Sequence, residues 1–256
     1  MRRADIFVPV LAVLTLGACA PALAPSTIRA FDVPAACPIS PGGFQENDGL
    51  NRTRAALRAG QLTILAVGSS SIEGVGASRP DLGYVPLVEA GLREAFPDAV
   101  ITVVNRGIGG ETTADTVNRL RAEIEAARPH LVIWQLGTND MLRDLTVAAV
   151  VQDFDRGRDI LGAAGVDVML IDPQRLPEET DNEGFRGRNA LLAAVSGTIA
   201  YLGRRNGYAV DPRFGPMSGW TGLEGGGVGP DDLHLNDAGY ACWAANTVAG
   251  LGDALR

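Results

Sequence analysis

Five apolar runs alternate with longer amphipathic segments along most of the chain. The runs include LTILAV, VITVV, LVIWQL and VMLI, and they are continuous rather than alternating, as is typical of strands covered by helices on both faces. They lie near residues 62–68, 100–105, 131–136, 167–172 and 208–211. The segments that flank them fit helices near residues 48–59, 83–95, 112–126, 145–163, 187–204 and 237–254. This order predicts an α/β fold, a three-layer α/β/α sandwich around a five-stranded parallel sheet.

The amino-terminal residues 1–18 have the pattern of an export signal. Arg2 and Arg3 precede an apolar stretch from Ile6 to Leu16, and small residues follow it. The stretch is too short for a comfortable membrane span, so a permanent anchor helix is the less favoured alternative. We therefore expect the chain to be exported.

The end of this signal resembles the lipobox of bacterial lipoproteins. In Leu16-Gly17-Ala18-Cys19 the cysteine would become the lipidated first residue of the mature chain, and the alternative is an ordinary signal peptide that contains a cysteine. The next residue is not the aspartate that commonly retains lipoproteins in the inner membrane. We expect a periplasmic protein attached to a membrane only through this lipid, with the outer membrane favoured.

Residues 19–43 are rich in Pro, Ala and Ser and are predicted to form a tether, followed by a single domain at residues 44–256. If lipid occupies Cys19, the remaining cysteines are Cys37 and Cys242. An even number in an oxidising compartment favours a disulfide between them. The alternative is a free Cys37 and a Cys242 that is a small buried residue of the last helix.

Composition excludes several classes of function. The formal net charge is −8, and all 22 basic residues are arginine. The acidic balance argues against a nucleic-acid partner, because phosphate neutralisation needs a basic surface. The absence of lysine excludes Schiff-base chemistry, a Ser-x-x-Lys dyad and a Gly-Lys-Ser/Thr phosphate loop. The glycine run 107–110 lacks the third glycine of a dinucleotide fingerprint, so NAD is not implied. No metal is implied either. The oligomeric state stays open.

Polar clusters follow the first three predicted strands. Ser69, Ser70 and Ser71 follow the first, residues 105–112 follow the second, and residues 137–140 follow the third. In an open parallel sheet the ligand site forms at the carboxyl ends of the strands, so all three clusters are expected at one edge.

A serine nucleophile needs a base, and the chain has two histidines. His130 lies at the amino end of its strand and is interpreted as structural. His234 lies on the loop that leads into the last helix, so it is the base by elimination. Positions three apart lie on the same side of a turn, which favours Asp231 over Asp232 as the carboxylate that orients the imidazole. Asp232 is expected to be a solvated loop acid.

A developing oxyanion needs preorganised donors. Gly110 can offer a backbone N–H in a loop where the absence of a side chain permits close approach. Asn139 can offer its side-chain amide. Both are candidate donors beside the serines.

Together these residues resemble the four blocks of the SGNH (GDSL-type) hydrolase family. Gly68-Ser69-Ser70-Ser71-Ile72-Glu73-Gly74 resembles the first block with Ser70 at the nucleophile position, Gly-Ile-Gly-Gly-Glu-Thr-Thr the second with Gly110, Gly-Thr-Asn-Asp the third with Asn139, and Asp-Asp-Leu-His the last with Asp231 and His234. Ser69 departs from the aspartate usual before the nucleophile. Ile72 breaks the Gly-x-Ser-x-Gly elbow, which disfavours an ordinary α/β-hydrolase.

The resemblance implies a flavodoxin-like SGNH hydrolase fold and a serine esterase without cofactor. Ser70 would attack a carboxylic ester with His234 as base and Asp231 as orienter, and the N–H groups of Ser70 and Gly110 with the amide of Asn139 would hold the oxyanion. Small-molecule or glycan esters are the expected substrates, and an exported member suggests O-acetyl groups on envelope glycans. The alternatives are an acyltransferase with the same site and a non-catalytic lipoprotein that binds envelope or glycan. The glycine-rich residues 222–229 are expected to form a mobile loop.

Overall fold

Five parallel strands form one sheet in the order β2-β1-β3-β4-β5 within the computed structural model, which describes residues 30–40 and 43–256. The strands are β1 Gln61–Gly68, β2 Val100–Gly107, β3 Leu131–Gln135, β4 Asp167–Ile171 and β5 Ala209–Asp211. This is the flavodoxin-like strand order. The predicted α/β sandwich with a five-stranded parallel sheet is therefore confirmed. The export signal and Cys19 lie outside the described residues.

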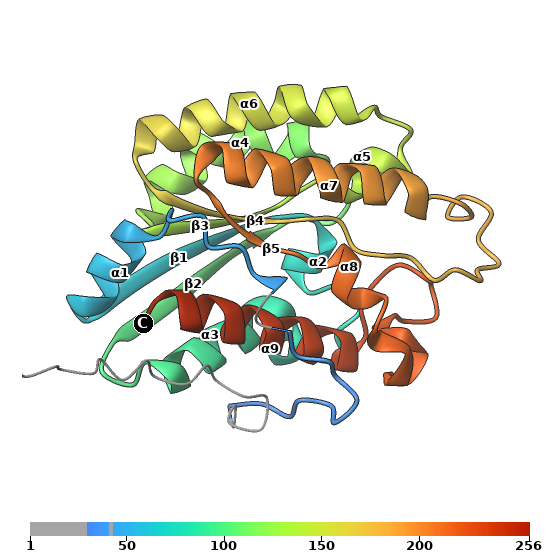
Figure 1. The fold of residues 1–256 in the computed structure, drawn as a ribbon, viewed down its shortest axis with the longest axis horizontal. Coiled ribbons are helices and arrows are strands. Elements are labelled where there is room, and N and C mark those ends of the chain that lie inside the picture. The colour runs from blue at the N-terminus through green and yellow to red at the C-terminus, as the bar shows by residue number, and fades with distance from the viewer. Residues whose placement is uncertain (1–29, 41–42) are drawn as a thin grey trace, which may run out of the picture.

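Helices cover both faces of the sheet (Figure 1). One face carries α3 Tyr84–Ala95 and α9 Asp237–Ala254, and the other carries α4 Thr113–Ala127, α6 Val147–Ala164 and α7 Asn189–Asn206. The helix α1 Asn51–Arg58 packs beside the amino end of the sheet, where Thr53 donates to Asp167. The shorter elements are α2 Ser70–Glu73, α5 Thr138–Leu142, α8 Phe214–Met217, η3 Pro80–Leu82, η4 Trp220–Gly222 and η5 Glu224–Gly227. Among the described residues, no helix combines the length and apolar character needed to cross a membrane.

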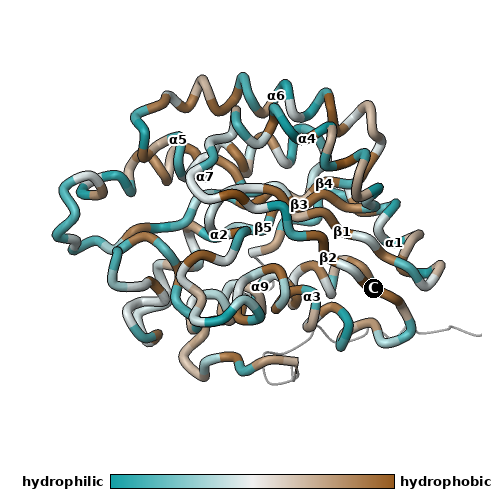
Figure 2. The backbone as a smooth tube through the Cα atoms, turned by 180° about the vertical axis from the view of Figure 1, so that it is seen from behind, coloured by the Kyte–Doolittle hydropathy of each residue, from teal (hydrophilic) through white to brown (hydrophobic). Residues whose placement is uncertain are grey.

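The side chains on the two faces of the sheet belong to two separate hydrophobic clusters. Ile64 and Ala66 of β1 pack with α3 and α9, whereas Leu65 and Val67 pack with α4, α6 and α7. Figure 2 shows the strands as the most hydrophobic part of the backbone, between helices whose outer turns are more polar. Because successive strand residues point to opposite faces and both faces are covered, the strands read as continuous apolar runs.

The segment that precedes the domain lies on its surface rather than forming a free tether. Phe31 packs against the cluster under α3 and α9. Cys37 is joined by a disulfide to Cys242 of α9, with the Cα atoms 5.4 Å apart, and this is the pair predicted from the sequence. Gln45 then forms an antiparallel bridge with Val210 of β5. Residues 30–40 of the predicted tether are therefore bound to the domain.

The glycine-rich segment 222–229 also packs more closely than expected. It includes the short helix η5, and Gly227 is buried against the Trp220 ring and Gly239, where an added Cβ would come within 2.7 Å of the ring. The Asn236 side chain donates to the Glu224 carbonyl at 2.8 Å. These contacts join the segment, which the sequence predicted to be a mobile loop, to the start of α9.

We expect the disulfide to contribute strongly to stability because it closes a long loop. Its cysteines are 205 residues apart, for which loop-closure entropy gives about 5 kcal/mol as an upper figure. Replacing both Cys37 and Cys242 with serine should lower the melting temperature in thermal unfolding. An unchanged melting temperature would contradict this role, and thiol titration of the unreduced, denatured wild-type chain should find neither cysteine reactive.

Candidate active site

Ser70 begins a one-turn helix directly after β1. Ser69 is the N-cap of α2, and Gly74 ends the turn in a left-handed conformation, with its N–H donating to the Ser70 carbonyl at 2.9 Å. A residue with a side chain would be strained at that φ of 101°. This tight turn places Ser70, which is partly exposed, at the carboxyl edge of the sheet.

The turn rests on the end of β2. Gly68 and Gly107 are paired in register as the last residues of β1 and β2. A Cβ on Gly107 would lie 2.1 Å from the Glu73 nitrogen, so only glycine permits this approach. Asn105 fastens the contact, because its side-chain amide donates to the Ile72 carbonyl at 2.9 Å.

The loop after β2 passes directly beside Ser70. An added Cβ on Gly109 would lie 3.9 Å from the Ser70 Cβ. The Gly109 N–H donates to the Glu73 carboxylate at 2.6 Å, and the Glu111 N–H donates to the Ile108 carbonyl at 3.3 Å. The N–H between them, that of Gly110, has no partner among the described residues. The loop therefore presents one free backbone donor beside the serine.

Gly110 is held in a left-handed conformation, with φ of 80°. Arg143 donates to its carbonyl oxygen at 2.6 Å. The Ser70 N–H, at the first position of α2, likewise lacks a partner within the described part of the chain, as first-turn amides do. The free amides of Ser70 and Gly110 are the two backbone donors that the sequence predicted for an oxyanion.

Asn139 extends from α5 toward the same loop. Its side-chain nitrogen donates to the Glu111 carbonyl at 2.8 Å, which occupies one of its two hydrogens. The neighbouring Asp140 is buried and accepts hydrogen bonds from the Thr113 N–H and hydroxyl, which joins α5 to the start of α4. Burial raises the pKa of the Asp140 carboxyl.

Asp231 and His234 form a hydrogen-bonded pair on the loop before α9. The Nδ1 atom of His234 lies 2.5 Å from Asp231 Oδ2, and Asp231 Oδ1 accepts from the N–H groups of His234 and Leu233 at 3.0 and 3.1 Å. Partial burial opposes ionisation of Asp231, but the hydrogen bonds from His234 and Leu233 outweigh it and lower the pKa of the carboxyl. Asp231 is therefore charged beside the imidazole.

Gly76, two residues after the Ser70 turn ends, lies against His234. An added Cβ on Gly76 would lie 2.9 Å from the His234 Cβ and 2.4 Å from the Leu235 carbonyl oxygen. No hydrogen bond joins the Ser70 hydroxyl to His234 among the bonds of the described residues. Such bonds often tighten only when substrate is bound. Because Asp231 engages Nδ1, Nε2 is the nitrogen that remains for proton transfer.

Two other predicted residues have clear places. Asp232 is half-buried on its loop and accepts a hydrogen bond from the Thr180 hydroxyl at 2.7 Å, a partner that the sequence did not predict. His130 Nδ1 accepts from the Thr63 N–H at 3.0 Å, beside the amino end of β3 and away from the Ser70 edge. That contact fits the structural role expected for His130.

Two buried glutamines that hold the Ser70 turn were missed from the sequence. Gln135 Oε1 accepts from the Ser69 N–H and hydroxyl at 2.8 and 3.0 Å. Gln174 Oε1 accepts from the Ser71 hydroxyl at 3.2 Å. The available signal was a polar residue at or just after the end of a buried strand.

No group of three or more His, Cys, Asp or Glu side chains with metal-binding geometry occurs within residues 30–40 and 43–256.

Comparison with known proteins relates the chain to esterases. Residues 36–224 match the non-GDSL lipase-like family. Esterase TesA of Pseudomonas aeruginosa is 32% identical over 168 residues, which cover 66% of this chain and 77% of TesA. The acetylxylan esterase of Geobacillus stearothermophilus is 34% identical over 89 residues, 31% of this chain and 40% of that enzyme. The structure of a two-domain esterase active on acetylated mannans, with mannopentaose, has a TM-score of 0.64 and 25% identity over 85% of this chain and 57% of its own.

The close approach at Gly107 makes a specific prediction. Gly107→Ala should displace the Ser70 turn, since the new methyl group would overlap the Glu73 backbone, and should lower both the melting temperature and the rate of aryl-ester hydrolysis. Gly162→Ala is the matched control, because nothing lies within 4 Å of a Cβ added at that exposed position of α6. The control should be neutral or more stable by about 0.5–1 kcal/mol. Equal behaviour of the two variants would refute the role of Gly107.

Proposed function

Because the chain belongs to the non-GDSL lipase-like family of SGNH hydrolases and is an ester-hydrolysing serine hydrolase, we propose that Ser70, His234 and Asp231 form its catalytic triad. The observation that carries the proposal is the His234 to Asp231 hydrogen bond of 2.5 Å beside the Ser70 turn. An imidazole oriented by a charged carboxylate, next to a serine at a helix start, is the arrangement that serine acyl transfer needs.

The first step is attack by the Ser70 oxygen on the ester carbonyl carbon. His234 Nε2 takes the hydroxyl proton as the new C–O bond forms, and the resulting imidazolium is stabilised by Asp231 through Nδ1. The tetrahedral intermediate then collapses, the bond to the alcohol breaks, and the imidazolium returns the proton to the leaving oxygen. The acyl group remains on Ser70 as an ester.

The oxyanion of this intermediate binds the free N–H groups of Ser70 and Gly110 and the second amide hydrogen of Asn139. Two of these donors lack a hydrogen-bond partner in the described part of the chain, so an oxyanion would replace water there rather than break a bond within that part. Water, giving a proton to His234, then attacks the acyl carbonyl carbon; the bond to the Ser70 oxygen breaks, His234 returns the proton to that oxygen, and the carboxylic acid leaves. The cycle needs no metal or organic cofactor.

The substrates we propose are O-acetyl esters of envelope glycans. Two of the similar proteins support this class, one named an acetylxylan esterase and one described as active on acetylated mannans. The export signal expected at residues 1–18 and lipid attachment at Cys19 would hold the enzyme in the periplasm, at the outer membrane, beside such polymers. A panel of aryl esters of increasing acyl length, run beside acetylated glycans, tests this, and preference for long acyl chains would contradict it.

Substitution of two adjacent serines distinguishes the nucleophile from its neighbour. Ser70→Ala should abolish aryl-ester hydrolysis, because no oxygen remains to attack the carbonyl. Ser69→Ala should keep substantial activity, since the Ser69 N–H still donates to Gln135. Steady-state kinetics with 4-nitrophenyl acetate measure both, and normal turnover by the Ser70 variant would overturn the proposal.

The acid and base should differ in their importance. His234→Ala should reduce kcat/KM more than Asp231→Ala, because the imidazole can still accept a proton without its carboxylate, though in the wrong tautomer part of the time. The pKa of Asp231 is lowered, so its carboxylate stays ionised as the pH falls toward acid and the charge that orients His234 is retained there. Asp232→Ala removes only the bond from Thr180 and should have the mildest effect. A severe Asp232 defect beside a mild Asp231 defect would reassign the third member.

A further inference from the structure

Gln174 is a buried side chain that contacts both halves of the proposed active site. It lies three residues after β4 and is 2% exposed. Its Oε1 accepts from the hydroxyl of Ser71, the neighbour of Ser70, at 3.2 Å. Its Nε2 donates to the carbonyl of Leu233, the neighbour of His234. One amide therefore links the residues adjacent to the nucleophile and to the base.

Covalent connectivity does not hold these two segments together at this place. Ser71 belongs to α2 near the start of the domain, and Leu233 belongs to the loop before α9 near its end. The two segments meet closely at Gly76, where a Cβ would overlap the Leu235 carbonyl oxygen. Direct bonds also cross between the segments, from Ser78 to Asp237 and from the Tyr240 hydroxyl to the Val75 carbonyl. The Gln174 bridge differs from them in joining the immediate neighbours of Ser70 and His234.

A neutral amide makes both bonds at once, which an ionised carboxylate cannot do. Its oxygen accepts from the serine hydroxyl while its NH₂ group donates to the carbonyl. An ionised carboxylate of the same size could still accept from Ser71, but it would face the Leu233 carbonyl without a hydrogen to donate. Both groups would then be buried and unsatisfied on that side, which is costly.

We propose that Gln174 is a positioning residue that sets the distance between Ser70 and His234. The inference rests on the proposed triad, since it acts through the neighbours of its nucleophile and base. Proton transfer depends steeply on that distance, and a displacement of about 1 Å can cost on the order of 10²-fold in rate. Gln174 touches neither substrate nor the reacting atoms.

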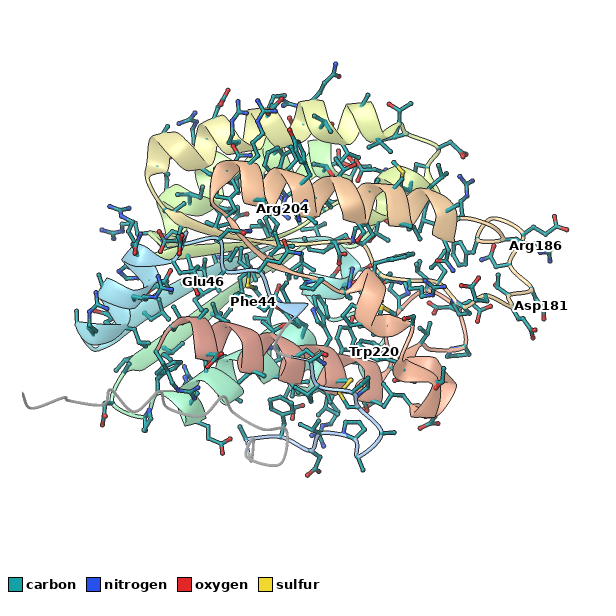
Figure 3. The ribbon with its side chains drawn as sticks, viewed as in Figure 1. Phe44, Glu46, Asp181, Arg186, Arg204 and Trp220 are labelled. Atoms are coloured by element: carbon teal, nitrogen blue, oxygen red, sulfur yellow. A yellow bond between two sulfur atoms is a disulfide. The ribbon has the colours of Figure 1, made fainter. Side chains whose placement is uncertain are left out.

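The loop that carries Gln174 makes a second bond to the same segment. Thr180 donates to Asp232 at 2.7 Å, two residues before His234. Farther along, the loop projects from the molecule, and Figure 3 shows Asp181 and Arg186 pointing outward near its tip. The loop therefore bonds the His234 segment at Gln174 and at Thr180, while its tip projects away.

The test compares two substitutions of Gln174 in the full chain. Gln174→Met keeps the length of the side chain but makes neither bond, so kcat/KM for 4-nitrophenyl acetate should fall by about 10- to 100-fold through kcat, with KM nearly unchanged. Gln174→Glu should depend on pH. Burial raises the pKa of such a carboxyl, and its protonated form can donate to Leu233 while still accepting from Ser71. Its kcat/KM relative to wild type should therefore rise as the pH falls.

Asn189→Leu is the matched control. Asn189 exchanges two hydrogen bonds with the backbone of Leu176, on the same loop, but contacts neither Ser71 nor Leu233. Loss of these bonds should lower the melting temperature while leaving the pH dependence of kcat/KM unchanged. Taking the ratio to wild type removes from the comparison any pH dependence that the two enzymes share.

Each outcome separates the inference from the triad on which it rests. If Gln174→Met loses thermal stability as the Asn189 variant does but keeps kcat/KM within about twofold of wild type, Gln174 is only structural and the inference fails. A Gln174→Glu to wild-type ratio that does not change with pH has the same meaning. If Gln174→Glu does not fold, the kcat and KM of Gln174→Met decide. Activity retained by Ser70→Ala would instead overturn the proposed function.

Discussion

The contact of two glycines at the carboxyl edge of the sheet is the constraint on which the site depends. Gly68 and Gly107 end β1 and β2 in register, and the turn that carries Ser70 lies across the second of them. Any side chain at Gly107 would enter the Glu73 backbone. The parallel sheet fixes where both strands end. Backbone packing at this close approach therefore sets the position of Ser70 relative to the Gly110 loop.

The histidine side of the site has a different support. Asp231 and His234 lie on a loop held at its ends, where Val228 pairs with Leu235 and where the Asn236 side chain caps α9. These contacts shape the loop itself but do not link it to β1. The serine and histidine segments are thus two separately ordered pieces, and their relative position depends on the few contacts that cross between them.

The sequence predicted the sheet and the candidate residues because both follow local rules. Continuous apolar runs predicted the strands, and polar residues after them predicted the edge where Ser70 and Asn139 lie. The one-turn helices α2 and α5 were missed because four or five residues carry no helical periodicity. The partners of Asp232 and Gln174 were missed because they come from segments distant in sequence, whose meeting only the tertiary fold determines.

The use of amides at the base of the site has an electrostatic reason. During the proposed reaction the imidazole gains and loses a proton, so a nearby buried carboxylate would change its own ionisation in step and disturb the balance. Gln135 and Gln174 make their bonds to Ser69 and Ser71 without adding a charge. Asp231 and Glu73, the exposed carboxylates beside the His234 ring and the Ser70 turn, are each bound to donors on their own side of the site, and the buried Asp140 is bonded to Thr113 on the Asn139 side. The two glutamines therefore add no charge beside the Ser70 turn, and the Asp231 carboxylate is the charge that hydrogen-bonds the His234 imidazole.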